Sequence, residues 1–392
     1  MYWIQCVENG PRRVNHAAGA LDNLIYSFGG YSNSEDYTRT TPIDIHVFNI
    51  YTLKWYSLSK PKKTDLKYDD APFSRYGHTV VVYKRKFYLW GGRNDHPGAC
   101  NRLFCFDPET LQWSRVCIMG DFIPTARDGH SACVVNDRMY IFAGFEDHSQ
   151  QFCNDLFYFD FNKSSWHICL PKDIDQVPQC RDFHSATNID NRMYIFGGRF
   201  DQIGPQQILQ NFYDNHLHIF NPNDNSWLDL TPQGQILYGR RSHSAFTHNG
   251  KLYIFGGYNN VIDTHFNDLH EFNPLTSLWR RIKPHGIINP VPRRRQCCLV
   301  IDHRMYMFGG TSPVSLTNLH DMEDTNGIRT GLYDQSDLYV FDFAPTLKTL
   351  CLLFLAQRRI SINNLSKTFH QEYKLFTQST ILRQRSTGET SG

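Results

Sequence analysis

A short run of apolar residues that ends in two glycines recurs along the chain. The clearest copy is Met-Tyr-Ile-Phe at residues 193–196, before Gly197 and Gly198, and an Arg-x-x-His stretch at residues 181–184 precedes it. Six copies are present, and their last glycines stand at positions 30, 92, 144, 198, 257 and 310; in the third copy Ala143 replaces the first glycine. An apolar run that does not alternate with polar residues is typical of a strand buried on both faces. The pattern therefore predicts six copies of one β-structural unit.

Each copy is predicted to hold four strands, named a to d. The Arg-x-x-His stretch opens strand a, the run before the glycines is strand b, a second apolar run is strand c, and strand d carries a tryptophan. Copies one to five contain Trp55, Trp113, Trp166, Trp227 and Trp279 in strand d. No tryptophan follows strand c of copy six, so we predict that Trp3 and the N-terminal strand complete that unit. Closure of this kind removes an exposed sheet edge.

A unit of about 50 residues with this order of apolar run, paired glycines and tryptophan resembles the kelch repeat. The resemblance implies an all-β fold in which residues 1–343 form a six-bladed kelch β-propeller closed by the N-terminal strand. Two polar stretches, residues 60–74 and 311–336, interrupt the rhythm as long loops. After the propeller, residues 344–377 change to helical spacing, and residues 378–392 are polar, which predicts a disordered tail.

The composition narrows the functional classes. A formal net charge of +2 is far from the strongly basic character of most nucleic-acid-binding domains, so we expect no direct nucleic-acid partner. The eleven cysteines form no CxxC pair, which argues against a disulfide framework or a zinc site. The first residues lack the features of a signal peptide, and the apolar run at residues 350–356 is too short to span a bilayer. We expect a soluble, reduced, cytoplasmic and nuclear protein without metal or cofactor.

Arginines gather where strand a begins and where the paired glycines end, and these loops are expected to surround the central opening. One set recurs in every copy, which favours a structural role: Arg13, Arg75, Arg127, Arg181, Arg240 and Arg294. A second set does not recur and is the better candidate for function. It comprises Arg93 and Arg199, directly after the glycines, and Arg12, Arg241, Arg293 and Arg295, which stand next to the recurring set.

A mouth with these extra guanidinium groups, lined by Tyr76, Phe183 and Tyr258, is suited to a small anion in a partly apolar cup. The planar fork of arginine makes bidentate hydrogen bonds to carboxylates, and the free C-terminus of a peptide is such an anion. The alternative is a soluble rim whose arginines pair with nearby aspartates, among them Asp128 and Asp182. Composition alone leaves both interpretations open.

Catalysis has little support in the sequence. Most of the histidines that look abundant occupy the repeat position itself, as His184 does, which favours structural strand residues over metal ligands. No HExxH, P-loop or nucleophile elbow is present. Other propellers do act as oxidases and sialidases, so an enzyme stays formally open, but we expect a non-catalytic protein.

The segment after the propeller carries the sharpest motif. Leu347, Cys351 and Leu355 are four residues apart, and on a helix they share one face, with Leu350 beside them. One interpretation is a helix that caps the propeller. The other is a helix that inserts a small cysteine between leucines into the groove of a partner.

This pattern, Thr346-Leu347 followed by Cys351 and Leu355, is similar to the BC box by which substrate receptors bind the Elongin B/C heterodimer. Downstream, Leu365, Phe369 and Tyr373 resemble the apolar positions of a cullin-2 box, although Ser366 stands where that box has proline. The resemblance implies three macromolecular partners, namely Elongin B/C, cullin-2 and the RING subunit that cullin-2 carries.

Propeller and tail together resemble the kelch-repeat substrate receptors of cullin-2 RING ubiquitin ligases. The resemblance implies a receptor that binds proteins ending in glycine and directs them to the proteasome. In a related receptor the terminal carboxylate is held by an arginine after the paired glycines and by a residue after the strand-a arginine of the next blade. These positions match Arg199 and Arg241 here. The full set of expected ligand-binding residues is Arg199, Arg241, Arg240, Ser242, Arg93, Tyr76, Phe183 and Tyr258.

Three further possibilities remain open. A chromatin-associated or recombination-related kelch protein would bind DNA or histone tails, and a non-ligase scaffold would be indifferent to Cys351. The chain itself ends in Ser391-Gly392, the type of terminus that such a mouth accepts, so self-association through Gly392 is also an option.

Overall fold

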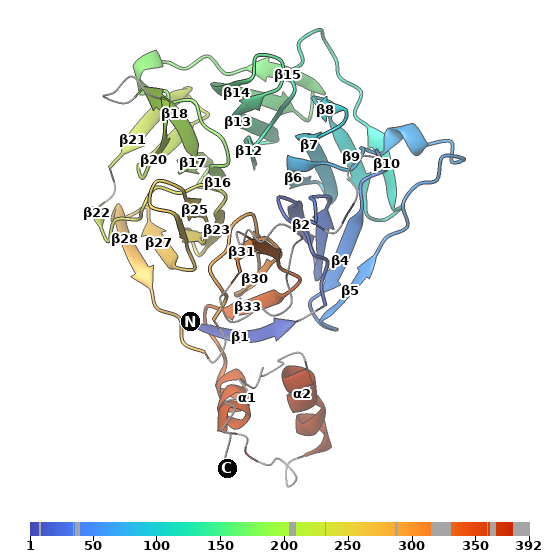
Figure 1. The fold of residues 1–392 in the computed structure, drawn as a ribbon, viewed down its shortest axis with the longest axis vertical. Helices are drawn as coiled ribbons and strands as arrows, with labels where there is room; N and C mark the ends of the chain where they lie inside the picture. Colours follow the sequence, from blue (N-terminus) through green and yellow to red (C-terminus); the bar gives the residue numbers. More distant parts are fainter. Residues whose placement is uncertain are drawn as a thin grey trace.

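The computed structural model describes residues 1–7, 9–33, 35, 40–203, 209–231, 233–286, 289–314, 331–358, 360 and 366–378. Six antiparallel sheets, the blades, stand around a central axis, with two helices outside the ring (Figure 1). The innermost strands of the blades are neighbours in sequence order, and the last of them lies beside the first. The predicted six-bladed propeller is therefore confirmed.

Each blade contains the four predicted strands, in the order a to d from the axis outward. Blades one to three are formed by β2 (Ala17–Leu21), β3 (Leu24–Phe28), β4 (Ile45–Asn49), β5 (Lys54–Ser57); β6 (Tyr76–Tyr83), β7 (Lys86–Asn94), β9 (Phe104–Asp107), β10 (Gln112–Arg115); β12 (Ser131–Val135), β13 (Arg138–Glu146), β14 (Gln151–Asp160) and β15 (Ser165–Ile168). Blades four to six are formed by β16 (Ser185–Ile189), β17 (Arg192–Phe196), β20 (Leu217–Asn221), β21 (Ser226–Leu230); β23 (Ser244–His248), β24 (Lys251–Phe255), β27 (Leu269–Asn273), β28 (Leu278–Ile282); β29 (Cys297–Ile301), β30 (Arg304–Phe308), β33 (Leu338–Asp342) and β1 (Tyr2–Val7).

The N-terminal strand closes the ring, as the tryptophan count predicts. β1 is the outer strand of blade six and pairs antiparallel with β33, so that Trp3 lies opposite Phe341. Trp3 is 3 % exposed and packs edge-on against Phe341, Tyr339 and Phe255. Residues from both ends of the propeller thus share one blade, which fixes the first strand to the last.

The apolar core lies between adjacent blades. It consists of six clusters, one at each blade-to-blade interface of the described ring. In every cluster the strand-d tryptophan packs on an aromatic ring of the preceding blade, in the pairs Trp55–Phe308, Trp113–Phe28, Trp166–Trp90, Trp227–Phe142, Trp279–Phe196 and Trp3–Phe255. Because aromatic rings bury large apolar areas, this contact explains why the tryptophan recurs in all six units.

The repeat histidines also connect neighbouring blades. The Nε2 atom of His78 bonds to the Phe28 carbonyl of blade one at 3.1 Å, and that of His130 lies 2.8 Å from the Thr79 hydroxyl of blade two. His184 and His243 make the equivalent contacts with serine hydroxyls of blades three and four. This geometry supports the structural interpretation of these histidines.

Short additional strands lie next to strands a, b and c at the end of the blades where the paired glycines lie. They are β8 (Gly98–Ala99), β11 (Arg127–Asp128), β18 (Arg199–Ile203), β19 (Leu209–Tyr213), β25 (Tyr258–Asn259), β26 (Thr264–His265), β31 (Thr311–Pro313) and β32 (Leu332–Asp334). A further strand, β22 (Gln233–Gly234), pairs in parallel with β28. Two 3₁₀ turns, η1 (Tyr68–Asp70) and η2 (Ile174–Gln176), lie in connections between blades. Of the two long loops predicted, residues 60–74 contain η1, and residues 311–336 contain β31 and β32.

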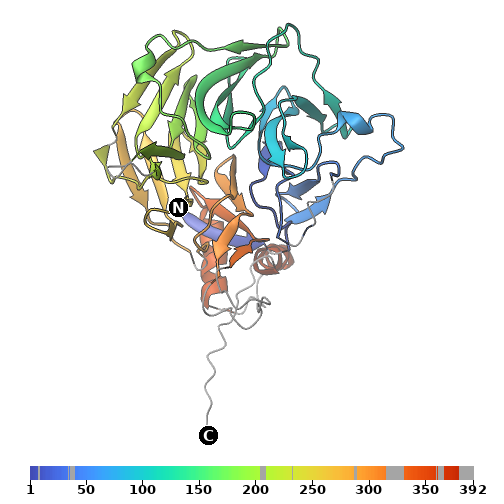
Figure 2. The same ribbon diagram turned by 45° about the horizontal axis from the view of Figure 1, so that its top comes forward.

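Two helices follow the propeller, α1 (Leu347–Arg358) and α2 (Lys367–Gln378), and both lie beside blade six outside the ring (Figure 2). Thr346 begins α1, since its hydroxyl accepts from the Thr349 amide at 3.2 Å, and Ser366 begins α2 in the same way through the Phe369 amide at 3.3 Å. Side-chain caps of this type satisfy amides that the helix leaves unpaired. The predicted disordered tail, apart from Gln378, lies outside the described residues.

Candidate functional site

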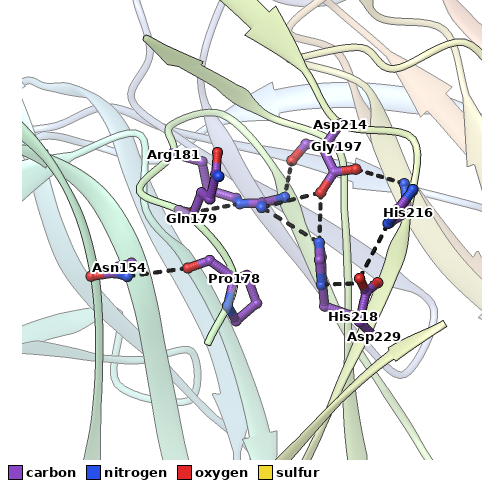
Figure 3. Close-up of polar contacts among 9 residues, drawn as sticks. All are labelled: Asn154, Pro178, Gln179, Arg181, Gly197, Asp214, His216, His218 and Asp229. Carbon is purple, nitrogen blue, oxygen red and sulfur yellow. Dashed lines mark hydrogen bonds and ion pairs between the residues drawn. The ribbon is translucent and has the colours of Figure 1, made fainter. Parts of the chain in front are cut away.

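The repeat arginine is buried inside its blade. Arg181 of blade four is only 1 % exposed, and all three of its guanidinium nitrogens are bonded (Figure 3). Nε donates to the Gln179 carbonyl at 3.0 Å, Nη1 to the Gly197 carbonyl at 3.0 Å, and Nη2 to the Asp214 carboxylate at 3.2 Å. Burial alone would raise the pKa of Asp214, but the hydrogen bond from His218 and the charge of Arg181 outweigh it and lower that pKa. The arginine therefore ties strands b and c of its blade together.

The same bond from Nη1 to a carbonyl 16 residues downstream is present in four other blades. Its donors are Arg75, Arg127, Arg240 and Arg293, and its acceptors are Gly91, Ala143, Gly256 and Gly309. A fully buried charge is stable only when it is paired and hydrogen-bonded. These contacts support the structural role inferred for the recurring arginines.

The structure corrects the sequence prediction in blade six. The recurring arginine there is Arg293, which is fully buried and bonded to Asp337, whereas Arg294 is the residue after it. Three consecutive arginines made the register ambiguous, and the glutamine that replaces the repeat histidine at position 296 hid the Arg-x-x-His signal. Arg294 therefore lies at the central opening and not inside the blade.

A second correction concerns Arg240, which the sequence places among the ligand-binding residues. Its guanidinium is buried against the Phe266 ring and bonded to Asp268 and to the Gly256 carbonyl. It cannot reach a ligand at the central opening without breaking these bonds. Arg240 therefore supports blade five.

Two residues after each repeat arginine, the backbone forms a closed ring around the axis, the inner ring. Each amide donates to the carbonyl of the equivalent residue in the preceding blade, at 2.7 to 3.3 Å. The members are Asn15, Gly77, Gly129, Phe183, Ser242 and Arg295. All six have positive φ values between 50° and 68°. That conformation suits the two glycines and strains the four residues with side chains, which the ring of bonds holds in place.

Around the inner ring lies the mouth, which we define by two positions in each blade. The residue after the repeat arginine pairs antiparallel with the residue after the two glycines. The six pairs are Val14–Tyr31, Tyr76–Arg93, Asp128–Phe145, Asp182–Arg199, Arg241–Tyr258 and Arg294–Thr311. The mouth is thus strongly asymmetric, with cationic residues concentrated in blades four to six.

Arg199, Arg241, Arg294 and Arg295 of these blades form one cluster beside Asp182, and the charge of Arg295 also acts on Asp128. Arg199 Nη2 lies 2.8 Å from Asp182 Oδ2, and Arg241 and Arg295 are close enough to lower the pKa of Asp182 by their charge. Arg294 lies over the Tyr258 ring at 4.4 Å, beside Arg241 at 5.8 Å from the same ring centroid. Among the described residues, the four guanidinium groups therefore outnumber the two carboxylates, Asp128 and Asp182, that interact with them.

Several buried nitrogens at the mouth have no hydrogen-bond partner among the described residues. They are the Nε atoms of Arg93, Arg199, Arg241, Arg294 and Arg295. Buried guanidinium nitrogens without partners are rare in folded proteins because each one loses its bonds to water. Five such nitrogens around one opening are available to water or to an anionic or oxygen-rich ligand.

The pKa values agree with this electrostatic picture. Burial raises the pKa of Asp128 to about 7 and that of Asp182 to about 6, against the opposing charges of neighbouring arginines. Burial, together with the neighbouring Arg295 and Arg241, lowers the pKa of Arg294 to about 10. Both carboxyls therefore carry less negative charge near neutral pH than exposed aspartates would.

The remaining predicted ligand-binding residues also border the central opening. Tyr76 donates to Asp95 at 2.6 Å, and Tyr258 donates to Asp263 at 2.8 Å. Phe183 and Ser242 belong to the inner ring, and Phe183 lies 5.6 Å from the Arg295 guanidinium. Arg93 stands apart from the cluster, near Asp128 on the opposite side. Arg12, which donates to Tyr333 at 2.9 Å, does not belong to the mouth.

A cavity of about 140 Å³ lies on the axis at the level of the inner ring. Each of the six blades contributes two lining residues, namely its inner-ring residue and the residue that follows. Five of the latter are repeat histidines, and burial holds the pKa of each below its usual range. Neutral imidazoles add no charge, so the positive potential of this region comes from the mouth arginines.

The helix α1 presents two different faces. Leu352, Leu353 and Ala356 are buried in a cluster with residues of blades one and six. Leu347, by contrast, is 77 % exposed, and Cys351 is exposed as well. Of the other residues predicted to bind Elongin, Leu350 is half-buried against that cluster and Leu355 is half-buried. One face of α1 therefore caps the propeller. The first residues of the predicted partner-binding face stay exposed to solvent.

The residues predicted to contact cullin lie differently. Phe369 and Tyr373 of α2 are half-buried and pack with Phe376 against the cluster that holds α1. Leu365 lies outside the described residues. Ser366, at the position where a cullin-2 box has proline, begins α2 as its cap. In this structure Phe369 and Tyr373 therefore join α2 to the propeller, and their role toward a cullin stays a prediction.

Two other features bear on function. In the described ranges, no three His, Cys, Asp or Glu side chains are grouped so that they could hold a metal ion. Neither of the described helices has the length and apolar character that would let it cross a membrane.

Sequence reasoning missed part of the cluster. The sequence places Arg294 in the recurring, structural set and Arg295 in the set that does not recur, and it includes neither among the expected ligand-binding residues. Gln296 is the signal that could have found both. If Gln296 is aligned with the repeat histidines, Arg293 aligns with the recurring arginines.

Comparisons with known proteins agree with this architecture. The KLHDC2/KLHL20/DRC7 Kelch-repeats domain matches residues 77–310, and the Kelch motif matches residues 12–62. Kelch domain-containing protein 3 of Homo sapiens is 43% identical over 377 residues, which are 96% of each chain. The Mus musculus protein of that name is 45% identical over 357 residues, 91% of this chain and 90% of its own.

A more distant similarity reaches an enzyme. The N-(sulfonatooxy)prop-2-enimidothioate sulfolyase of Thlaspi arvense is 25% identical over 260 residues, 63% of this chain and 73% of the enzyme. The matches above are longer and much stronger. The chain belongs to the kelch-repeat propeller family, within the group of Kelch domain-containing protein 3.

Proposed function

We propose that this protein is the non-catalytic substrate-recognition subunit of a cullin-2 RING ubiquitin ligase. Elongin B/C links it to the cullin, and its mouth binds proteins that end in glycine and so marks them for degradation, in the cytoplasm and the nucleus. The observation that carries this proposal is that α1 has one buried face and one exposed face. Leu352, Leu353 and Ala356 attach the helix to the propeller, and Leu347 and Cys351 remain exposed for a partner.

An apolar helix face that stays exposed on a folded protein requires a reason. Leucine at 347 and cysteine at 351 are the positions of a BC box, and a small side chain between larger ones fits a narrow pocket in a partner. A helix that only caps the propeller would carry polar residues on its solvent-exposed face. The exposed pair therefore favours a receptor over a scaffold that has no use for Cys351.

The mouth supports the choice of ligand. A peptide carboxylate carries one negative charge and two acceptor oxygens, which match a pair of guanidinium groups such as those of Arg199 and Arg241. Their Nε atoms have no partner among the described residues. Ser242 stands between Phe183 and Arg295 in the backbone of the inner ring. The Arg295 guanidinium lies 5.6 Å from the Phe183 ring, so we expect the space above Ser242 to be narrow. This arrangement favours glycine at the last position.

The test is co-elution of the purified protein with Elongin B/C in size exclusion chromatography. The wild type is expected to co-elute, and a Leu347→Ala/Cys351→Ala variant is expected to elute separately with an unchanged melting temperature. Tyr51→Ala, which alters an exposed aromatic residue on blade one, is the matched control and should still co-elute. Failure of the wild type to co-elute would refute the receptor role.

A further inference from the structure

One turn at the mouth end of blade five is apolar where its counterparts are polar. In blades two, three and five, the residue after the paired glycines begins a short hairpin whose turn lies entirely within the described residues. These turns comprise residues 95–97, 147–150 and 260–263. The first two read Asp-His-Pro and Asp-His-Ser-Gln, whereas the third contains Val261 and Ile262. These two side chains are 67% and 47% exposed, so blade five presents a pair of apolar residues to solvent.

The backbone of this turn is anchored by a buried asparagine. The Asn259 carboxamide oxygen accepts from the Val261 amide at 2.9 Å, and its nitrogen donates to the Gly239 carbonyl at 2.7 Å. Asn94 anchors the polar turn of blade two in the same way, since its nitrogen donates to the Ser74 carbonyl at 2.8 Å. The turn therefore forms without apolar side chains. An apolar pair on a backbone that is already fixed loses little conformational freedom when a ligand covers it.

The turn is continuous with the mouth. The strand before it, β25, begins at Tyr258, the mouth residue that pairs with Arg241. The first residue of the turn, Asn260, accepts a hydrogen bond from the Tyr213 hydroxyl, and Tyr213 pairs with Arg199. Two tyrosines thus connect the turn to the two arginines proposed to hold a terminal carboxylate. Because an extended chain advances ~3.3 Å per residue, ligand residues a few positions before the terminus reach this turn.

The apolar character continues over blade five, beside the turn. Tyr238 is 66% exposed, and its ring stacks on that of Phe266 with 6.4 Å between the centroids. The next residue, Gly239, accepts the hydrogen bond from Asn259, which places Tyr238 near the turn. We define the apolar rim as Tyr238, Val261 and Ile262. Exposed apolar residues that stand together on a folded protein mark interaction sites.

We propose that the apolar rim binds an apolar side chain of the ligand, roughly two to five positions before its terminal glycine. This inference rests on the function proposed above and adds a second feature to its substrates, namely an apolar residue upstream of the free carboxylate. The arginines of the mouth hold the carboxylate, the chain leaves over blade five, and the upstream side chain loses its contact with water on the rim. The turns of blades two and three carry aspartates instead.

The experiment measures the binding of short labelled peptides to the full chain by fluorescence anisotropy. A reference peptide has serine at every position before its terminal glycine, and each of the other peptides replaces one serine with leucine. Leucine at one or more of these positions is expected to raise the affinity about tenfold, because part of its side chain becomes buried on the rim. The same leucine peptide with a terminal amide should bind poorly, since carboxylate and rim act together.

A double variant tests the surface. Val261→Ser/Ile262→Ser is expected to abolish the gain from leucine and to leave the affinity for the reference peptide unchanged. The matched control is Leu275→Ser, which alters a side chain that is 94% exposed in the turn between strands c and d of the same blade, at the opposite end. This control should keep the preference for leucine.

The outcomes separate the two proposals. If the reference peptide binds but leucine brings no gain, or if the double variant keeps that gain, the apolar rim is not part of the site and the proposed function stands. If the wild type binds none of the peptides, the proposed ligand is wrong, and the inference fails with it.

Discussion

The arginines show how the position of a single residue decides its role. Arg240 and Arg241 are adjacent in the sequence, yet the first is enclosed in blade five with Asp268 and the second faces the mouth with its Nε unpaired. A strand alternates its side chains between opposite sides, so neighbours meet different surroundings. Removal of one arginine should unfold a blade locally, whereas removal of the other should remove a ligand contact.

We predict that Arg241→Ala weakens binding of a glycine-terminated peptide by about 10- to 150-fold, the loss of one charge-assisted interaction of ~1.5 to 3 kcal/mol. The melting temperature should stay within a degree or two, because no ion pair joins Arg241 to another of the described residues. Fluorescence anisotropy with a labelled peptide measures the affinity, and the same peptide with a C-terminal amide should bind poorly. The exposed Arg192→Ala is the control, and equal affinity in both variants would remove Arg241 from the site.

The buried carboxyl of Asp128 makes stability depend on pH. Its pKa is about 7 in the folded protein against a usual value of 3.8. The folded state therefore keeps a proton that the unfolded chain releases between roughly pH 4 and pH 7, and stability falls as pH rises through that window. The gap of about 3 units corresponds to at most ~4 kcal/mol at ~1.36 kcal/mol per unit.

We therefore expect Asp128→Asn to raise the melting temperature at pH 8 and to leave it nearly unchanged at pH 4. Differential scanning calorimetry across this range measures the difference between the variant and the wild type. Asp121→Asn, at an exposed position, should show no such pH-dependent gain. A constant difference at all pH values would mean that Asp128 does not keep its proton in the folded state.

At the scale of elements, α1 has one face that packs on the propeller and another that stays exposed. Its inward face belongs to the cluster of blades one and six, and α2 adds Phe376 to that cluster. An ion pair between Lys348 and Glu372, at 2.5 Å, also connects the two helices. The helices are thus held in place by apolar contacts with the propeller. The residues that make these contacts are not part of the motif that resembles a BC box.

Leu353→Ala is expected to loosen both helices, because loss of a buried leucine side chain costs about 2 to 5 kcal/mol. Leu353 is 5 % exposed. Hydrogen exchange should accelerate in α1 and α2 and stay unchanged in blades two to four. Leu347→Ala, at an exposed position of the same helix, should leave exchange unaltered. Equal protection in the Leu353→Ala variant would show that the helices fold independently of the propeller.

At the scale of the whole molecule, the ring is closed twice. β1 completes blade six through its pairing with β33, and the inner ring joins all six blades by backbone hydrogen bonds. The pairing of β1 covers the edge that β33 would otherwise expose, and each blade of the closed ring supports both neighbours. The propeller should therefore unfold as one unit, with the closing strand as a site of high sensitivity.

Trp3→Ala is expected to destabilise the entire propeller by about 3 to 5 kcal/mol, the usual cost of removing a buried aromatic residue. Chemical denaturation followed by circular dichroism should show a lower midpoint in one transition. Tyr51→Ala, whose side chain is 75% exposed, provides the control. A midpoint equal to the wild type would mean that β1 does not contribute to closure.

The sequence by itself determined the number of blades, the order of strands and the closing role of Trp3, because each rests on a local apolar pattern that repeats. It also identified Arg199, Arg241 and the Leu347–Cys351 pair as candidates. Tertiary structure alone decided that Arg293 is buried while Arg294 joins the mouth, and that α1 docks through Leu352 and Leu353. These outcomes depend on contacts between segments far apart in the chain. At such contacts, a shift of one residue in the alignment changes a side chain from buried to exposed.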